Sequence, residues 1–88
     1  MKVEEEIKKD LEGEVYDTLI LDYDVQIEID PNFIHKEVTK ILNKKLVEKL
    51  IKLKNHNELE YYIVLHDLAN TICKKIILYN IVKILSKL

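Results

Sequence analysis

The sequence contains no arginine, no tryptophan and only one glycine, one proline and one cysteine among its 88 residues. A single glycine excludes the glycine-rich loops that bind nucleotide phosphates. A single cysteine excludes a disulfide within the chain and is typical of a reducing compartment. Arginine most often makes the paired hydrogen bonds to guanine, so its absence disfavours base-specific DNA recognition. We therefore expect no nucleotide cofactor.

Long apolar runs are also absent. The longest covers residues 61–65, whereas crossing a bilayer takes about 20 residues. The charged start MKVEEEIKKD lacks the apolar stretch of a secretory signal. The sequence therefore predicts a soluble cytoplasmic protein with no membrane contact.

The composition is that of a folded protein, with 48% hydrophobic and 34% charged residues. We expect a single domain over residues 1–88. A chain of this size buries only about 60% of its unfolded surface, so association would add stability. Enrichment in lysine and glutamate is consistent with a thermophile.

The charges divide along the chain. Residues 1–30 hold eleven acidic residues and three lysines, whereas residues 31–88 hold eleven lysines and five acidic residues. This division favours contact between the two halves, within one chain or between chains.

The first 30 residues predict one helix and one strand. Val3, Ile7 and Leu11 recur every four residues and predict a helix over 2–12, with Gly13 at its C-terminal cap. From Leu19 to Asp30 apolar and polar residues alternate, which is the period of a half-buried strand.

Two long helices are predicted to follow. Asp30 and Pro31 have the types of an N-cap and a first helical residue, and the apolar spacing predicts a helix over 31–54. Asn57 and Glu60 form a capping-box pattern for a helix over 58–88. That helix would be about 45 Å long, against about 30 Å for a globule of this size. We expect it to break near Asn70-Thr71, or to project and pack against another chain.

These elements predict an α+β fold: a short N-terminal helix, one long strand and two long helices packed against it. One strand leaves its backbone groups without partners, so we expect it to pair antiparallel with the same strand of a second copy, which makes the protein a homodimer. The alternative is a hairpin within one chain, in which residues 15–21 pair with residues 25–29.

The order of strand, helix and helix over about residues 19–88 resembles that of the ribbon-helix-helix transcription factors. In that family the outward strand residues read base edges. Here that strand face is acidic, and such a face would repel phosphates. We therefore interpret it as a candidate acidic docking face for a protein, formed by Asp22, Asp24, Glu28 and Asp30.

Lysines dominate the exposed side of the predicted helix over 31–54, and Lys36, Lys40 and Lys44 share one face as a candidate basic face. Such a face either contacts phosphates electrostatically or is simply solvated. We favour the solvated face, or one matched to an acidic partner.

The sequence offers one weak polar constellation. His66, Asn70 and Cys73 share one helical face. His66 and Cys73 are about 10 Å apart along the axis, too far for a nucleophile and its base, and no further cysteine or histidine cluster completes a zinc site. We expect these residues to pack at a helix interface, with no catalytic and no metal-binding role.

Together these patterns predict a non-enzymatic homodimeric protein-interaction or regulatory module. The alternative is a DNA-binding transcriptional regulator that uses the lysine-rich helix over 31–54.

Overall fold

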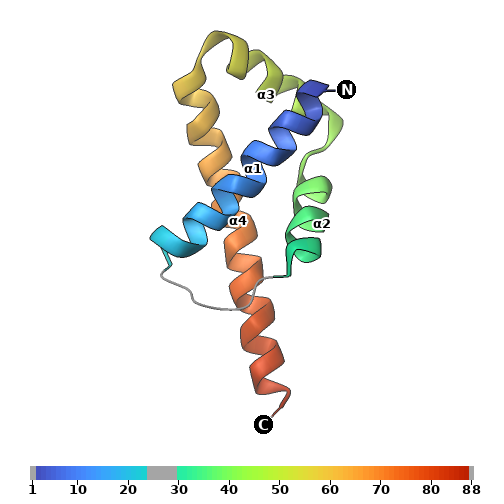
Figure 1. Ribbon diagram of the computed structural model, residues 1–88, viewed down its shortest axis with the longest axis vertical. Coiled ribbons are helices and arrows are strands. Elements are labelled where there is room, and N and C mark those ends of the chain that lie inside the picture. The colour runs from blue at the N-terminus through green and yellow to red at the C-terminus, as the bar shows by residue number, and fades with distance from the viewer. Residues whose placement is uncertain (1, 24–29, 88) are drawn as a thin grey trace.

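The computed structural model describes residues 2–23 and 30–87. Within them the chain forms four helices: α1 (Lys2–Leu21), α2 (Pro31–Ile41), α3 (Lys44–His56) and α4 (Glu58–Leu85) (Figure 1). The described residues contain no strand. The predicted α+β fold is therefore wrong, and the protein is a helical bundle.

Helix α1 runs through the predicted cap at Gly13 and into the predicted strand. Ile7, Leu11, Val15 and Leu19 follow one another every four residues, and all four are fully buried. One helical face thus continues past residue 12, and its burial outweighs the alternation that begins at Leu19. Gly13 lies on the exposed side of this helix, where the cost of a helical glycine is small enough to be tolerated.

The strand-based predictions fall with this finding. Residues 15–21 are helical, so the intrachain hairpin is wrong. The strand expected to pair between two copies cannot include residues 19–21. The resemblance to ribbon-helix-helix proteins depended on the same strand, so it does not hold. The remaining part of the predicted strand, residues 24–29, lies outside the described residues.

The predicted helix over 31–54 is two helices. Its start is confirmed, because the Asp30 side chain accepts a hydrogen bond from the backbone N–H of Asn32 at 3.0 Å and Pro31 occupies the first turn. The break falls at residues 42–43, where Asn43 becomes the N-cap of α3 and accepts from the N–H of Leu46 at 2.9 Å.

Helix α4 is continuous over 28 residues, so the expected break near Asn70-Thr71 is wrong. Its predicted N-cap at Asn57 is confirmed, although the Asn57 backbone N–H donates to the Leu53 carbonyl and not to Glu60 as in a capping box. Asn57 Oδ1 accepts from the N–H of Glu60 at 3.2 Å, and the Asn57 side-chain amide donates to the Glu60 carboxylate at 3.3 Å.

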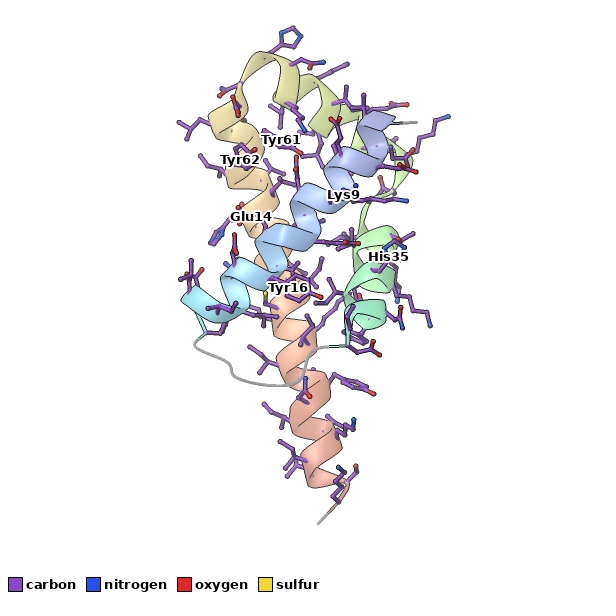
Figure 2. All side chains as sticks on the ribbon, in the orientation of Figure 1. Lys9, Glu14, Tyr16, His35, Tyr61 and Tyr62 are labelled. Atoms are coloured by element: carbon purple, nitrogen blue, oxygen red, sulfur yellow. The ribbon has the colours of Figure 1, made fainter. Side chains whose placement is uncertain are left out.

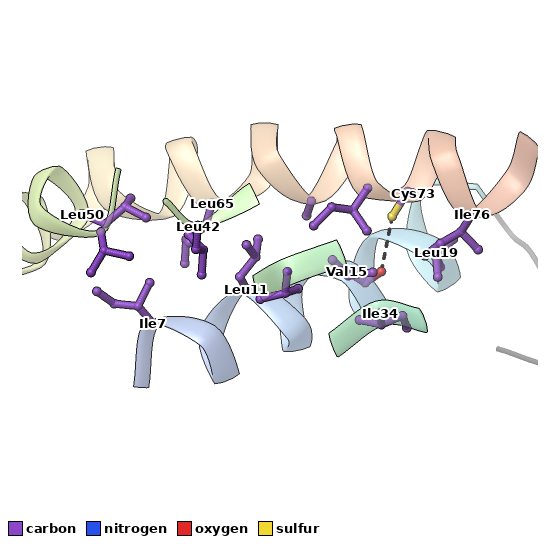
Figure 3. Close-up of a cluster of buried hydrophobic side chains, with 14 of the residues drawn as sticks. Ile7, Leu11, Val15, Leu19, Ile34, Leu42, Leu50, Leu65, Cys73 and Ile76 are labelled. Carbon is purple, nitrogen blue, oxygen red and sulfur yellow. Dashed lines mark hydrogen bonds between the residues drawn. The ribbon is translucent and has the colours of Figure 1, made fainter. Parts of the chain in front are cut away.

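The four helices share one core. Helix α1 lies across α4, α3 turns back at the upper end, and α2 lies beside α1 (Figure 1). Figure 3 shows side chains of α1, including Leu11 and Leu19, facing Leu65 and Ile76 of α4. The molecule measures 49 × 23 × 17 Å, with α3 near one end of its long axis and the C-terminal end of α4 at the other (Figure 1).

Candidate interaction surface

The last part of α4 extends beyond the helices that cover the rest of it (Figure 1). The buried residues of α4 begin at Tyr61 and end at Ile76, and none of residues 77–85 is buried. We call residues 77–85 the α4 tip. At a rise of about 1.5 Å per residue, it adds about 13 Å of helix after the last buried residue.

The α4 tip is apolar and open to solvent. Figure 2 shows its side chains spreading around the helix with no other helix along its lower end. Six large apolar side chains are between 47% and 61% exposed: Leu78, Tyr79, Ile81, Val82, Ile84 and Leu85. An exposed apolar cluster of this kind marks a contact site more often than a single exposed leucine does.

The apolar side of the α4 tip does not continue the core-facing side of α4. From buried Ile76, steps of four and seven residues along the same helical face lead to Asn80 and Lys83. These are polar, and the Asn80 side-chain amide turns back to donate to the Ile76 carbonyl at 2.8 Å.

The opposite side of the α4 tip carries an apolar stripe, formed by Leu78, Ile81, Val82 and Leu85. Just before the stripe, the residues on the same side of α4 are polar and exposed: Asp67, Thr71 and Lys74. The stripe is therefore a separate surface that begins where the bundle ends.

An aromatic contact joins the base of the α4 tip to the bundle. The ring of Tyr79 stacks on that of Phe33 in α2, with centroids 5.2 Å apart and an interplanar angle of 29°. Offset aromatic pairs of this kind are worth about 0.5–1.5 kcal/mol beyond their buried area. The pair ties α2 to the first turn of the α4 tip and leaves the stripe open.

Two members of the candidate acidic face, Asp22 and Asp30, are among the described residues. Asp22, just after α1, has its Oδ2 3.4 Å from Nε2 of His66. Asp30 instead caps α2. Asp24 and Glu28 lie outside the described residues. The two described members therefore act at separate places.

The candidate basic face is divided between two helices. Lys36 and Lys40 are exposed on one side of α2. Lys44 lies beyond the break at Asn43, as the first residue of α3. The single helical face that was to carry all three lysines does not exist.

The residues of the polar constellation each make their own contact. His66 Nδ1 lies 3.6 Å from the Glu14 carboxylate of α1. The Tyr23 hydroxyl donates to Asn70 Oδ1 at 2.7 Å.

Cys73 is fully buried, and its thiol donates to the Val15 carbonyl at 3.5 Å (Figure 3). Burial raises the pKa of the Cys73 thiol to about 11, which keeps it in the unreactive protonated form at neutral pH. The three constellation residues thus hold α4 against α1 and the turn that follows it.

A charged cluster between α1, α3 and α4 was missed by the sequence reasoning. Asp10 Oδ2 accepts from the hydroxyl of buried Tyr61 at 2.7 Å and from Lys54 Nζ at 3.0 Å. Lys54 also lies 3.6 Å from the Glu6 carboxylate. The hydrogen bond to Asp10 raises the pKa of Lys54, and burial together with the same carboxylate raises that of Tyr61.

The charge division of the sequence indicated contacts between its halves, and the pairs of Asp10 and Glu6 with Lys54 are such contacts. No sequence pattern, however, singled out Asp10 or Tyr61, which are 51 positions apart.

Two further findings concern the described residues as a whole. None of their helices is long and apolar enough to span a membrane. Nor do three histidine, cysteine or carboxylate side chains gather among them where a metal ion could bind.

Comparison of the chain with protein-family models, curated proteins and solved structures finds no match.

Proposed function

We propose that the protein is a non-enzymatic interaction module that binds a protein partner through the α4 tip. One observation carries the proposal: on the last turns of α4, beyond the core, six large apolar side chains are each about half exposed. Monomeric proteins rarely expose a contiguous apolar area above a few hundred Å² unless it serves a contact.

The residue types of the α4 tip support this role. Ile81, Val82 and Ile84 are β-branched, and such residues form helices less well than alanine, leucine, lysine or glutamate. They therefore add little to the helix itself. In the core-facing part of α4 such residues are buried, as Ile72 and Ile76 are, and at the α4 tip only a partner would bury them.

The titratable groups of the described residues give no sign of a catalytic site. Among them, the pKa values that are raised belong to Lys54, Tyr61 and Cys73. Each of these side chains is engaged in a contact between helices. Their perturbation therefore has a structural cause, since helix packing alone accounts for the burial and the hydrogen bonds.

Site-specific photocrosslinking tests the proposal. The photoreactive amino acid benzoylphenylalanine replaces Leu85 in the α4 tip, and in a control it replaces Glu5, which is exposed on α1. After irradiation in an extract of the native cells, we expect discrete covalent protein adducts from position 85 and none from position 5. If position 85 gives no adduct with any protein, the proposal is wrong.

A second candidate function is electrostatic binding of nucleic acid. Six lysines of α2 and α3 are exposed: Lys36, Lys40, Lys44, Lys45, Lys49 and Lys52. They predict sequence-independent duplex binding that weakens steeply as salt rises. An electrophoretic mobility shift with random duplex DNA at low salt tests this, and the absence of a shift would remove the candidate.

A further inference from the structure

We infer that the partner of the α4 tip is the α4 tip of a second copy, paired antiparallel about a two-fold axis. This inference rests on the proposed function and names its partner. The homodimer expected from the sequence is thereby assigned to a helix in place of a strand.

The apolar stripe is self-complementary in the antiparallel direction. Its members Leu78, Ile81, Val82 and Leu85 are separated by steps of three, one and three residues, so the pattern reads the same from either end. A two-fold axis between Ile81 and Val82 places each of them opposite the other in the second copy. It also places Leu78 of each copy opposite Leu85 of the other, as a symmetric interface requires.

The polar residues that border the stripe favour this register. Lys74 lies on the same side of α4, one turn before Leu78. In the antiparallel register it lies beyond the end of the paired stripe, where its ammonium group stays in water. A parallel pair would place the two Lys74 side chains side by side, and like charges at that distance repel.

The stripe offers a small interface. Its four side chains, those of Leu78, Ile81, Val82 and Leu85, are 47–61% exposed. A contact made by four side chains of each copy belongs to the small, weak class of interfaces, which bury less than about 1,200 Å² in total. We expect a dimer that dissociates on dilution.

The primary test is the mass of the protein in solution, measured by sedimentation equilibrium over micromolar to millimolar concentrations. We expect the mass to rise from that of the 10.5 kDa chain toward twice that value and to stop there. A mass that stays monomeric overturns the inference. So does a mass that grows past two copies, because that indicates head-to-tail assembly.

Two lysine variants assign the contact to the stripe. Leu85→Lys and Ile20→Lys change residues that are equally exposed, at 61% each, on α4 and α1 respectively. We expect Leu85→Lys to weaken dimerisation at least tenfold and Ile20→Lys to leave it unchanged. Circular dichroism of each variant verifies that the fold is kept. Equal effects of the two variants would contradict the assignment to the stripe.

A charge pair tests the orientation. In the antiparallel register, the double variant Ile81→Lys, Val82→Glu brings opposite charges together across the axis, whereas Ile81→Lys, Val82→Lys brings like charges together. We expect the first variant to dimerise at least tenfold more tightly than the second at low salt. Equal loss in both variants would exclude the antiparallel register.

Failure of the inference and failure of the proposed function are distinguishable. If the protein is monomeric at all concentrations but position 85 crosslinks to a different protein, the second copy is excluded and the interaction module stands. If position 85 also gives no adduct, both are wrong.

Discussion

Replacement of Tyr61 by phenylalanine is the sharpest test of the described packing, because it removes one oxygen atom and leaves the ring in place. Tyr61 is fully buried, and its hydroxyl donates to Asp10 Oδ2 at 2.7 Å. Hydrogen bonds to charged groups contribute about 1.5–3 kcal/mol. The Asp10 side chain is 30% exposed, so water can partly replace the lost donor. We therefore expect Tyr61→Phe to lower the free energy of unfolding by about 1.5 kcal/mol.

The neighbouring tyrosine supplies a matched control. Tyr62 lies on the same turn of α4 and is 42% exposed, so Tyr62→Phe should change stability by less than about 0.5 kcal/mol. Urea denaturation followed by circular dichroism measures both variants. Asp10→Ala removes the acceptor, and in that background Tyr61→Phe should have little further effect, which makes the pair a double-mutant cycle.

The outcome that refutes this reasoning is specific. If Tyr61→Phe costs no more than Tyr62→Phe, the hydroxyl of Tyr61 is not bonded to Asp10 in the folded protein. The contact between α1 and the start of α4 would then be misplaced, and the position of the α4 tip relative to the bundle would need revision.

Three further changes test other parts of the structure. Gly13→Ala should raise the free energy of unfolding by about 0.5–1 kcal/mol, because an added Cβ meets no atom within 4 Å; thermal denaturation measures it. Asn43→Ala should cost about 1 kcal/mol by removing the N-cap of α3, whereas Asn55→Ala, in the exposed last turn of α3, should cost less than half as much in urea. In the folded protein the pKa of the Cys73 thiol is about 11, against 9.0 ordinarily. The contribution of the buried thiol to stability is therefore fully present below about pH 9 and is lost as the pH rises through 11. The advantage of the native protein over Cys73→Ala should therefore shrink by about 2–3 kcal/mol between pH 8 and pH 11, and an unchanged difference would show that the thiol is not buried.

The starts of α2 and α4 were predictable because each depends on neighbouring residues. Asp30 with Pro31, and Asn57 with Glu60, cap their helices as their types and spacing predicted. The end of α1 depends instead on contacts with a distant segment. Alternation from Leu19 onward is a local pattern, but α4 buries Val15 and Leu19 on one helical face and so extends α1.

The break at Asn43 was hidden for a related reason. Val38, Leu42 and Val47 are all buried in the common core, so the apolar spacing continues across the bend between α2 and α3. A periodic pattern reports which side of the backbone is buried and does not report a change of its direction.

The candidate surface was only partly readable from the sequence. Apolar residues from Leu59 to Leu88 cover nearly the whole circumference of the predicted helix, a pattern typical of a helix that is buried on most sides. The pattern could not distinguish buried residues such as Ile76 from exposed ones such as Leu78, because both are aliphatic. That division depends on where α1 and α2 end beside α4.

The placement of α3 and the α4 tip at opposite ends of a 49 Å molecule has a consequence for how the protein would act. Joined end to end through their tips, two copies would form a rigid spacer that displays the same α3 surface twice, facing in opposite directions. Such a dimer gains avidity only for targets that carry two binding sites separated by its own length. Its selectivity would therefore depend on the spacing of those two sites more than on its affinity for either one.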